Sequence, residues 1–396
     1  MRIFTPKQRK QVALLIETSN QYARGLLLGI NRYLQEHPDW SVYLGEISRN
    51  NQDMSWLSDW HGDGILARIE TDETADYIMN SGLPAIDLSA SRKLPGLTCV
   101  ETNDQAIAVM AADHFLENGF KHFAYYGDNC FQWSIHRDQH YRSYLGAKGF
   151  DCLSFKAAND NAQQGASWEN HINELVRWLK QLPKPVGIMC CYDIRGQQLL
   201  EACRLAEIDV PDEVAVIGVD NDELLCDLST PRLSSIQTNP QQAGYLAAQL
   251  LDRQIAGERI GSEIYLIDPL QLQIRMSSDV LAVEDKTVSE AIRFIRQHAH
   301  ENIQVQDILN HIPVTRRVLE SRFLKALGRT PHEQIISIKL KMVKQLLEET
   351  ELSLADIAER TGFKHTEYMS VVFNREFHIR PGQYRKERIL SMPMKP

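Results

Sequence analysis

The chain has 396 residues, a length that predicts two or three domains rather than one compact core. Its apolar content of 43% is that of a globular protein, and no apolar run reaches the length of a membrane-spanning helix. The formal charge of −9 conceals an asymmetry, because residues 1–284 carry 24 basic and 38 acidic side chains, whereas residues 285–396 carry 19 and 14. An acidic body joined to a basic tail favours a polyanion that contacts only the tail.

The amino terminus and the cysteines indicate the compartment. The basic start is followed by only five apolar residues, Val12 to Ile16, which is too short for the apolar core of a signal peptide. The seven cysteines show no metal-ligand spacing, and Cys190 and Cys191 are adjacent, so free thiols are the better interpretation. We therefore expect a cytoplasmic protein with no membrane contact, metal or cofactor.

Short apolar runs alternate with amphipathic segments over the first 275 residues. The alternation predicts βαβ units and a doubly wound parallel sheet. The expected helices include the segments 25–34, 106–116 and 175–182. The runs that read as buried strands are Val12–Ile16, Gly64–Ala67, Ala85–Leu88, Phe123–Tyr126, Val186–Cys190 and Val214–Val219.

Parallel sheets bind ligands at the carboxyl ends of their strands, and polar and aromatic side chains gather there in this sequence. No glycine-rich phosphate loop occurs at any of these ends. Carboxylate and guanidinium groups bind hydroxyls, and aromatic faces pack on C–H surfaces, so the pattern suits a neutral polyol. The candidate ligand contacts are Asn20, Tyr22, Asp87, Trp133, Arg137, Tyr192, Asp193 and Asp220.

Each candidate also has a purely structural interpretation. An aspartate at a strand end is commonly a helix cap or turn former, an interpretation that applies most directly to Asp193. Trp133 and Tyr22 suit core packing as well as a sugar platform. The acidic stretch after Asp220 lacks the ligand spacing of an EF-hand. Glycoside hydrolysis by two distant carboxylates stays open as an alternative.

Four stretches of this first part resemble the effector domain of LacI-type repressors, which is similar to periplasmic sugar-binding proteins. They are FKHFAYYG at residues 120–127, the spacing Trp133-x3-Arg137-x3-Tyr141, VPDEVAVIGVD at residues 210–220 and PRLSSI at residues 231–236.

The resemblance implies two lobes with chain crossings near Thr102 and Gln237. It also places sugar contacts at Asp87, Arg137, Asp220 and the Tyr192-Asp193 position, where many relatives have Asn-Asp. Asn221 to Glu223 are expected to start the next helix, with Leu224 and Leu225 on its inner face.

The last 112 residues contain an internal repeat. Gln304-Val-Gln-Asp-Ile-Leu aligns with Ser353-Leu-Ala-Asp-Ile-Ala at an offset of 49, and Phe323 and Pro331 align with Phe373 and Pro381 at an offset of 50. Each copy predicts a short helix, a turn and a second helix, at about 304–327 and 353–377. A helix carrying Ile336, Leu340, Val343 and Leu347 would connect the copies and fix their spacing.

The stretch TELSLADIAERTGF at residues 350–363, followed by Phe373-x7-Pro381-Gly-Gln-Tyr-Arg385, resembles the AraC-type DNA-binding domain. The resemblance implies that the second helix of each copy enters a major groove. Phosphate contacts are expected from Arg322, Arg375, Arg380, Arg385 and Lys386. The groove-facing residues would be Arg316, Arg317, Glu320 and Ser321 in the first copy, and His365, Thr366, Glu367, Ser370 and Val371 in the second.

The sequence therefore predicts a sugar-sensing and dimerisation domain at residues 1–284 and an all-α domain with two helix-turn-helix units at residues 285–396. This order resembles the bacterial xylose-operon activators over nearly the whole chain. It implies a non-enzymatic, homodimeric transcription activator that responds to D-xylose or another pentose, binds double-stranded DNA and acts on RNA polymerase. A transport binding protein and a sugar-processing enzyme are the alternatives from other classes.

Overall fold

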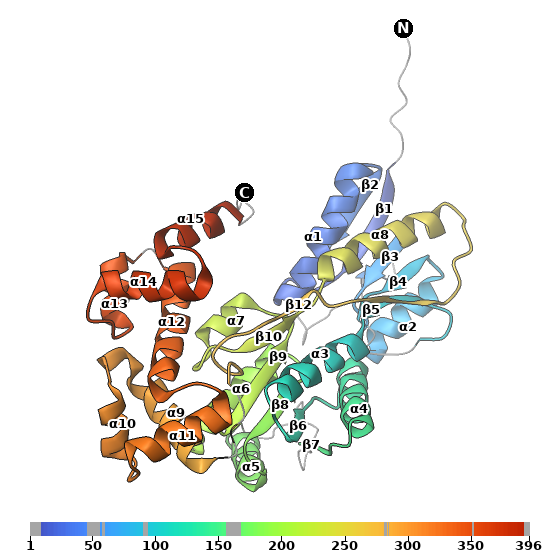
Figure 1. The fold of residues 1–396 in the computed structure, drawn as a ribbon. Coiled ribbons are helices and arrows are strands. Elements are labelled where there is room, and N and C mark those ends of the chain that lie inside the picture. The colour runs from blue at the N-terminus through green and yellow to red at the C-terminus, as the bar shows by residue number, and fades with distance from the viewer. Residues whose placement is uncertain are drawn as a thin grey trace. The chain divides into compact units, whose positions relative to one another are not determined.

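The structure is a computed structural model that describes residues 9–45, 56–57, 60–89, 94–155, 168–280, 283, 285–350 and 352–391 (Figure 1). It divides into two compact units, Met1–Leu281 and Ala282–Pro396. The predicted boundary after residue 284 falls on a position outside the described residues. The first helix of the second unit begins at Lys286, and the Asp285 carboxylate caps it by accepting from Thr287 and Val288.

The first unit has two lobes, each built around a six-stranded sheet (Figure 1). The sheet of lobe 1 is entirely parallel and runs in the order β11-β5-β4-β3-β1-β2. Its strands are β1 (Lys10–Leu15), β2 (Trp40–Leu44), β3 (Gly64–Ala67), β4 (Ala85–Asp87), β5 (Thr98–Thr102) and β11 (Ile264–Ile267).

Both faces of the lobe 1 sheet are covered, which is why its strands read as continuous apolar runs. Val12 and Leu14 of β1 pack with helices α1 (Gln21–Glu36) and α8 (Pro240–Ile255), and Ala13 and Leu15 pack toward α2 (Asp72–Ser81). Helices α1 and α8 touch backbone to backbone. A Cβ at Gly29 would lie 2.0 Å from the Gln241 carbonyl oxygen, so glycine is required at this crossing.

The sheet of lobe 2 runs in the order β12-β10-β9-β8-β6-β7 and is parallel except for β12. Helices α5 (Trp168–Gln181) and α6 (Asp193–Leu205) contribute to the core on one face, and Phe115 of α3 (Asp104–Glu117) packs on Gly187. Helix α4 (Gln132–Ala147) packs on α3. The strands are β6 (His122–Tyr126), β7 (Cys152–Ser154), β8 (Val186–Cys190), β9 (Val214–Val219), β10 (Ser234–Gln237) and β12 (Gln271–Gln273).

The six predicted strands are confirmed, with ends shifted by at most two residues. The chain crosses between the lobes after β5 and after β10, at the two predicted places, and a third time between β11 and β12. The third crossing escaped prediction because β11 and β12 are short strands with partly exposed side chains. Strand β12 lacks the continuous apolar run that marks a buried strand, whereas β11 has such a run, Ile264–Ile267, and was not predicted.

The second unit is all-α and holds the two predicted helix-turn-helix units. The first helix-turn-helix consists of α10 (Val305–His311) and α11 (Arg316–Leu327), and the second consists of α13 (Leu354–Arg360) and α14 (Thr366–Phe377). The aligned residues Gln304 and Ser353 both form capping boxes, with Asp307 and Asp356. The remaining elements are α9 (Lys286–His298), a 3-10 turn (Ala299–Glu301), α12 (Pro331–Glu349) and α15 (Pro381–Ser391).

Helix α12 connects the two helix-turn-helix units by contributing to both of their cores. Ile335 and Ile338 join the core of the first, whereas Leu340, Val343 and Leu347 join the core of the second. One continuous helix therefore belongs to both units and fixes their spacing, as the sequence predicted.

Candidate ligand-binding and nucleic-acid-binding sites

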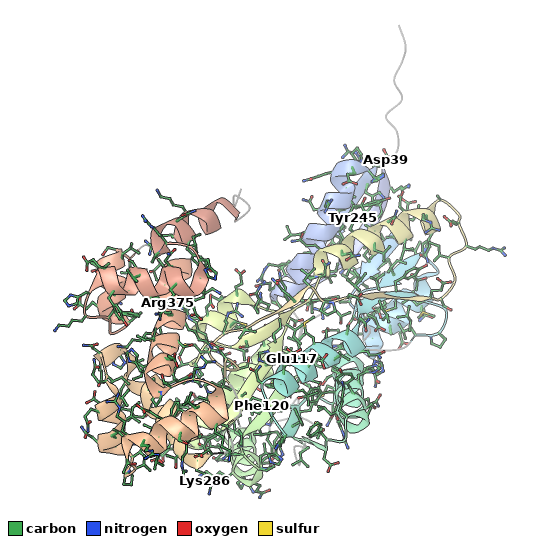
Figure 2. The ribbon with its side chains drawn as sticks, in the orientation of Figure 1. Asp39, Glu117, Phe120, Tyr245, Lys286 and Arg375 are labelled. Atoms are coloured by element: carbon green, nitrogen blue, oxygen red, sulfur yellow. The ribbon has the colours of Figure 1, made fainter. Side chains whose placement is uncertain are left out.

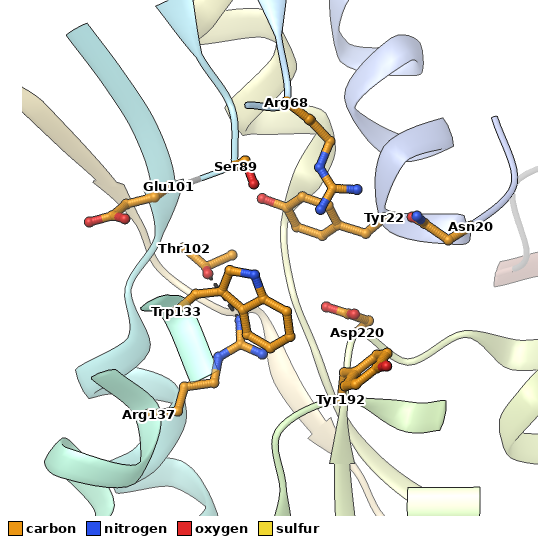
Figure 3. Close-up of a pocket in the computed structure, with 10 residues that line it drawn as sticks. All are labelled: Asn20, Tyr22, Arg68, Ser89, Glu101, Thr102, Trp133, Arg137, Tyr192 and Asp220. Carbon is orange, nitrogen blue, oxygen red and sulfur yellow. Dashed lines mark hydrogen bonds between the residues drawn. The ribbon is translucent and has the colours of Figure 1, made fainter. Parts of the chain in front are cut away.

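A pocket lies between the two lobes of the first unit, where strand ends of both sheets meet (Figure 3). Lobe 1 contributes residues from the start of α1, from the ends of β3 and β4 and from β5. Lobe 2 contributes residues from α4, from the start of α6 and from the end of β9. The lining residues are Asn20, Tyr22, Arg68, Ser89, Glu101, Thr102, Trp133, Arg137, Tyr192 and Asp220.

On the lobe 1 side, a buried guanidinium is held by two carboxylates. Arg68 donates to Glu17 and, at 2.8 Å, to Glu70, and its guanidinium lies 5.4 Å from the centre of the Tyr22 ring. Burial opposes the charge on Arg68, but Glu70 and Glu17 outweigh this effect and raise its pKa above the ordinary value. Asn20 caps α1 and also donates to Glu17, so the Glu17 carboxylate is held by both Arg68 and Asn20.

On the lobe 2 side, Arg137 is the corresponding buried cation. Its Nε lies 2.7 Å from Asp104 Oδ1, and its two terminal nitrogens donate to the Cys191 carbonyl and to the Thr102 hydroxyl. Thr102 ends β5 and Asp104 begins α3, so Arg137 is tied to the first crossing between the lobes. The guanidinium is therefore fixed in place at the floor of the pocket.

An aromatic group forms another wall of the pocket. Trp133 stacks on Phe131, with ring centres 5.1 Å apart, and meets Tyr192 edge-on at 5.7 Å. The Arg137 guanidinium lies 4.8 Å from the centre of the Trp133 ring. Both predicted aromatic candidates, Trp133 and Tyr22, line the pocket, and Tyr192 lines it as well.

Asp220 lies at the end of β9 in a turn whose backbone is unusual. The φ angles of Asp220 and Asn221 are 103° and 51°, a region that L-residues seldom adopt. Three successive backbone N–H groups are each held: Asp220 by the Ile236 carbonyl, Asn221 by the Ser235 hydroxyl and Asp222 by a carboxylate of α6. This turn directs the Asp220 carboxylate toward the pocket (Figure 3).

The predicted helix after Asp220 is present as α7 (Glu223–Leu228), with Asp222 as its N-cap. The prediction for its inner face was wrong at Leu224, which is 68% exposed, whereas Leu225 is half-buried. The fully buried side chain is Cys226, which was not predicted.

Asp193 was predicted as a ligand contact but does not line the pocket. Its carboxylate is buried and accepts from the Asp222 N–H at 2.7 Å and from the Ser235 hydroxyl at 2.5 Å. Burial, followed by the nearby charge of Asp220, raises the pKa of Asp193 well above its ordinary range. In this structure Asp193 therefore holds the turn that carries Asp220, which is the structural interpretation of an aspartate at a strand end.

Asp87 was also predicted as a ligand contact, and it too is absent from the pocket lining. Its Oδ1 atom accepts from the backbone N–H groups of Ile69 and Ser89, at 3.2 and 2.9 Å. Ser89 itself lines the pocket. The carboxylate of Asp87 thus holds the loop after β4, and these amides satisfy part of a buried carboxylate's need for donors.

Four pocket residues were not predicted. Arg68 directly follows β3 and Ser89 closely follows β4, so the rule of polar strand ends could have found both. Glu101 and Thr102 belong to β5, whose sequence TCVET alternates in burial and has no continuous apolar run. The alternation is in burial and not in residue type, so the sequence carried no local signal for these two residues.

The charges that line the pocket balance. The lining holds two guanidinium groups, Arg68 and Arg137, and two carboxylates, Glu101 and Asp220. Each guanidinium is also paired with a carboxylate of the protein outside the lining. Counted with these partners, carboxylates outnumber guanidiniums around the site, so no positive charge is left over for an anionic ligand. Such a set of hydrogen-bond donors and acceptors suits an uncharged ligand rich in hydroxyl groups.

In the second unit, the predicted groove-facing residues of the first helix-turn-helix lie on α11. Arg316, Arg317 and Ser321 are exposed, and Glu320 is half-buried. Arg316 Nε donates to Glu320 Oε1 at 2.9 Å, one helical turn away. Leu319 and Phe323 on the opposite side are fully buried, so the helix presents one polar face to solvent.

Helix α14 and the residue before it carry the predicted groove-facing residues of the second helix-turn-helix. His365 precedes the helix as its N-cap, Thr366 and Ser370 are half-buried, and Glu367 is exposed. Val371 is 65% exposed, which suits an apolar contact with a thymine methyl group. The exposed ring of Tyr368 lies on the same helix and was not predicted.

The predicted phosphate contacts differ in exposure, and Arg385 is half-buried. Arg375, labelled on α14 in Figure 2, is exposed, as are Arg380 and Lys386. Arg322 donates to Asp285 at 3.2 Å and to Thr287 at 2.8 Å, and these partners belong to the start of α9. Arg322 therefore ties α11 to α9 in this structure.

Neither unit offers a metal site among the residues that the structure describes, where no group of three or more His, Cys, Asp or Glu side chains could hold an ion. Within the same residues, no helix combines the length and apolarity needed to cross a bilayer.

Comparison with protein families assigns each part of the chain. Residues 11–104 match the XylR N-terminal domain, residues 112–278 match a periplasmic binding protein-like domain, and residues 308–387 match a helix-turn-helix domain. The first two matches fall on the two-lobed unit, and the third falls on the all-α unit.

Similarity to whole proteins covers nearly the entire chain. The xylose operon regulatory protein of Haemophilus influenzae is 30% identical over 388 residues, which covers 96% of this chain and 99% of the relative. The Escherichia coli protein of the same name is 29% identical over 386 residues, with 96% and 97% covered.

A solved structure described as the xylose-binding transcription activator XylR superposes with a TM-score of 0.81 at 28% identity, covering 97% of this chain and 99% of that one. The transcriptional regulator CelR in complex with cellobiose superposes at 0.56 with 20% identity over 69% of this chain, a likeness of fold alone. The paired architecture, the sequence relatives and the full-length superposition agree, and the chain belongs to the xylose operon regulatory protein family of DNA-binding transcription regulators.

Proposed function

We propose that this regulator binds D-xylose in the pocket between its lobes, without turning it over, and in response activates genes of pentose catabolism. The pocket charge carries the proposal, because both buried guanidiniums are already paired with protein carboxylates and leave no positive charge for an anionic ligand. The names of the relatives that match over their full length supply the choice of xylose.

Six of the eight predicted contacts line the pocket and are proposed as direct sugar contacts. Asp220 accepts hydrogen bonds from one or two hydroxyls, Arg137 and Asn20 donate or accept, and Trp133, Tyr22 and Tyr192 supply apolar and hydroxyl contacts. Ser89, Glu101 and Thr102 add further hydroxyl and carboxylate partners from lobe 1. Asp87 and Asp193 do not contact the sugar in this proposal. Asp87 holds Ser89, and Asp193 holds the turn that carries Asp220.

On the DNA side, we propose that α11 and α14 enter neighbouring turns of the major groove. The groove-facing set is Arg316, Arg317, Glu320, Ser321, His365, Thr366, Glu367, Ser370 and Val371. The regulator would act in the cytoplasm as a homodimer that contacts RNA polymerase, because a dimer places its helices on two operator half-sites. Sedimentation of the full chain over a concentration series tests the dimer, and a monomer at all concentrations would remove it.

Thermal unfolding in the presence of a sugar panel tests the ligand assignment. The panel contains D-xylose, L-arabinose, D-ribose, D-glucose and the anion D-xylonate. At a thousand times its Kd, the effector should stabilise the two-lobed unit by about 4 kcal/mol. The proposal expects this shift with D-xylose and none with D-xylonate. A shift with D-xylonate but not with D-xylose would overturn it.

Chromatography of the sugar recovered from the same samples tests whether the protein is a binder only. Unchanged D-xylose after long incubation is the expected result. Accumulation of a product in proportion to the protein concentration would assign an enzymatic activity instead.

A further inference from the structure

The side-chain amide of Gln21 bridges the two lobes at the edge of the pocket. Its Nε2 atom donates to the Asn221 carbonyl oxygen at 3.1 Å, and its Oε1 atom accepts from the Glu223 backbone N–H at 3.1 Å. Gln21 is the first residue of α1 in lobe 1, whereas its partners lie in lobe 2, Glu223 at the start of α7 and Asn221 two residues before it. Both polar atoms of the Gln21 amide therefore form hydrogen bonds to lobe 2.

The bridge stands next to residues of the ligand site without being part of it. Gln21 lies between Asn20 and Tyr22, which both line the pocket, and Asn221 directly follows Asp220, which lines it from the other lobe. Gln21 itself is not among the lining residues. The bridge thus joins the two walls of the pocket beside the ligand site.

The lobe 2 partner is itself connected to the end of the first unit. Asn221 Oδ1 accepts from Arg275 Nη1 at 2.9 Å, and the same nitrogen donates to the Leu233 carbonyl at 3.0 Å. Arg275 lies two residues after β12, in the last segment of the two-lobed unit before the helix-turn-helix unit begins. Two further bonds pin this segment, from Ser277 to Arg232 and from Val216 to Ser277.

We propose that Gln21 is an interlobe latch: it closes lobe 1 onto the Asp220–Glu223 segment when the effector is bound, and through Asn221 and Arg275 it communicates closure to the segment that precedes the DNA-binding unit. The proposal rests on the proposed function, because it takes a sugar between the lobes as the closing ligand. Gln21 is a positioning residue, since it acts on the pocket walls and not on the sugar.

The effect of the latch follows from linkage. The two hydrogen bonds exist only with the lobes together, and a ligand held by both lobes also favours that arrangement. The latch and the bound ligand therefore stabilise each other, and loss of the latch weakens sugar binding although no sugar contact is removed. Two neutral hydrogen bonds correspond to about a tenfold rise in the Kd.

Amide hydrogen exchange of the full chain, with and without saturating D-xylose, tests the latch directly. The variants are Gln21→Ala and Gln21→Glu, which keeps the size of the side chain but sets a carboxylate against the Asn221 carbonyl. The control is Gln35→Ala, at an exposed glutamine near the other end of α1. We expect both Gln21 variants to speed exchange severalfold in residues 220–228, and the control to match the wild type.

The same measurement tests communication along the chain. In the wild type, D-xylose should slow exchange in residues 271–278 as well as in 220–228, and in Gln21→Ala the effect on 271–278 should be lost. Wild-type rates for both Gln21 variants in both segments, with and without sugar, would overturn the latch. A change with Gln21→Ala but none with Gln21→Glu would also overturn it, because packing and not hydrogen bonding would then be responsible.

Titration calorimetry with D-xylose separates the latch from the proposed function. A Kd about tenfold higher for both Gln21 variants, and unchanged for Gln35→Ala, supports the latch. An unchanged Kd for the Gln21 variants overturns it and leaves the sugar assignment standing. If the wild type binds no D-xylose, the sugar assignment fails, and the ligand-free exchange rates in residues 220–228 then decide the latch alone.

Discussion

The carboxylate of Asp193 accepts a hydrogen bond from the backbone N–H of Asp222 at 2.7 Å. Neither residue lines the ligand pocket, but their bond holds the turn that carries Asp220, which does. Between the end of β9 and Asp222 stand Asp220 and Asn221, with φ angles of 103° and 51°. A backbone in this region costs about 1–3 kcal/mol and persists only where its surroundings hold it. Asp193 and Ser235 provide that hold, and Asp220 reaches the pocket as a result.

Two substitutions should separate the ligand contact from its support. Asp220→Asn removes a charged acceptor from the pocket and should weaken D-xylose binding about 10- to 100-fold with little loss of stability. Asp193→Ala leaves the Asp222 N–H and the Ser235 hydroxyl without their acceptor. It should cost about 2–4 kcal/mol of stability and also weaken sugar binding. Calorimetry and chemical unfolding measure the two effects, with the exposed Asp151→Asn as control. Equal stability losses in both variants would contradict the division of roles.

A second prediction concerns pH and lobe 1. Asp252 of α8 accepts hydrogen bonds from Lys10, Trp40 and Tyr33, which belong to β1, β2 and α1. Burial opposes the negative charge of Asp252, but these donors outweigh it and lower the pKa of Asp252 below its ordinary value. A depressed carboxyl pKa stabilises the fold above the unfolded-state value of about 3.9, and the contribution is lost as the pH falls through the folded-state value.

Asp252→Asn should therefore destabilise lobe 1 by about 1–2 kcal/mol at pH 7, and the difference from the wild type should shrink as the pH falls below about 4. Thermal unfolding between pH 7 and pH 3 measures it, and the exposed Asp76→Asn is the control. A difference that grows toward low pH would contradict the assignment.

The same region shows how α8 and α1 are joined. Tyr245, labelled in Figure 2, extends from α8, donates to Glu36 of α1 at 2.7 Å and meets the Tyr33 ring edge-on at 5.4 Å. Asp252 lies two helical turns further along α8. The strand β1, helix α1 and helix α8 are thus held by polar contacts at the edge of their common apolar core.

Much of this architecture could be predicted because the relevant signals are local. Continuous apolar runs marked most of the central strands, and the repeat at offsets of 49 and 50 marked both helix-turn-helix units. The aligned residues Gln304 and Ser353 cap the first helix of each unit in the structure. The edge strands β2 and β12 are interrupted by polar residues, whereas β11 is a continuous apolar run that was not predicted. Asp193 and Asp87 were placed in the correct region, but whether a carboxylate meets ligand or backbone depends on its partners from distant segments, such as Ser235 and Ile69.

A third prediction uses two glycines of the second unit. Gly362 and Gly328 both have φ near +68°, at 69° and 67°. A Cβ at Gly362 would lie 2.2 Å from the Ala299 carbonyl oxygen, whereas nothing lies within 4 Å of one at Gly328. Gly328→Ala should therefore cost about 1–2 kcal/mol from the backbone alone, and Gly362→Ala should cost at least about 2 kcal/mol more.

Calorimetric unfolding of the full chain measures both glycine variants in the transition of the DNA-binding unit. Equal costs would show that the turn of the second helix-turn-helix does not depend on its close approach to Ala299.

A fourth prediction follows from the repeat itself. His378 ends α14 with φ of 56°, at the position aligned with Gly328 at the end of α11. A residue with a Cβ is strained in this conformation, so His378→Gly should stabilise the DNA-binding unit by up to about 1 kcal/mol. His332→Gly, in the first turn of α12, should do the reverse because glycine weakens a helix. A raised melting temperature for the first variant and a lowered one for the second is the expected pattern, and destabilisation by both would refute it.

The most direct test of the account is the affinity of the full chain for DNA in the presence and absence of D-xylose. A duplex selected from a random library by the protein with D-xylose serves as the probe, and fluorescence anisotropy at fixed salt gives the Kd. We predict that D-xylose tightens binding to this duplex at least about tenfold, that D-glucose does not, and that Arg316→Ala with Arg317→Ala abolishes sequence-specific binding while leaving the sugar affinity unchanged. Equal affinity for the duplex with and without D-xylose, in a protein shown to bind the sugar, would contradict the account.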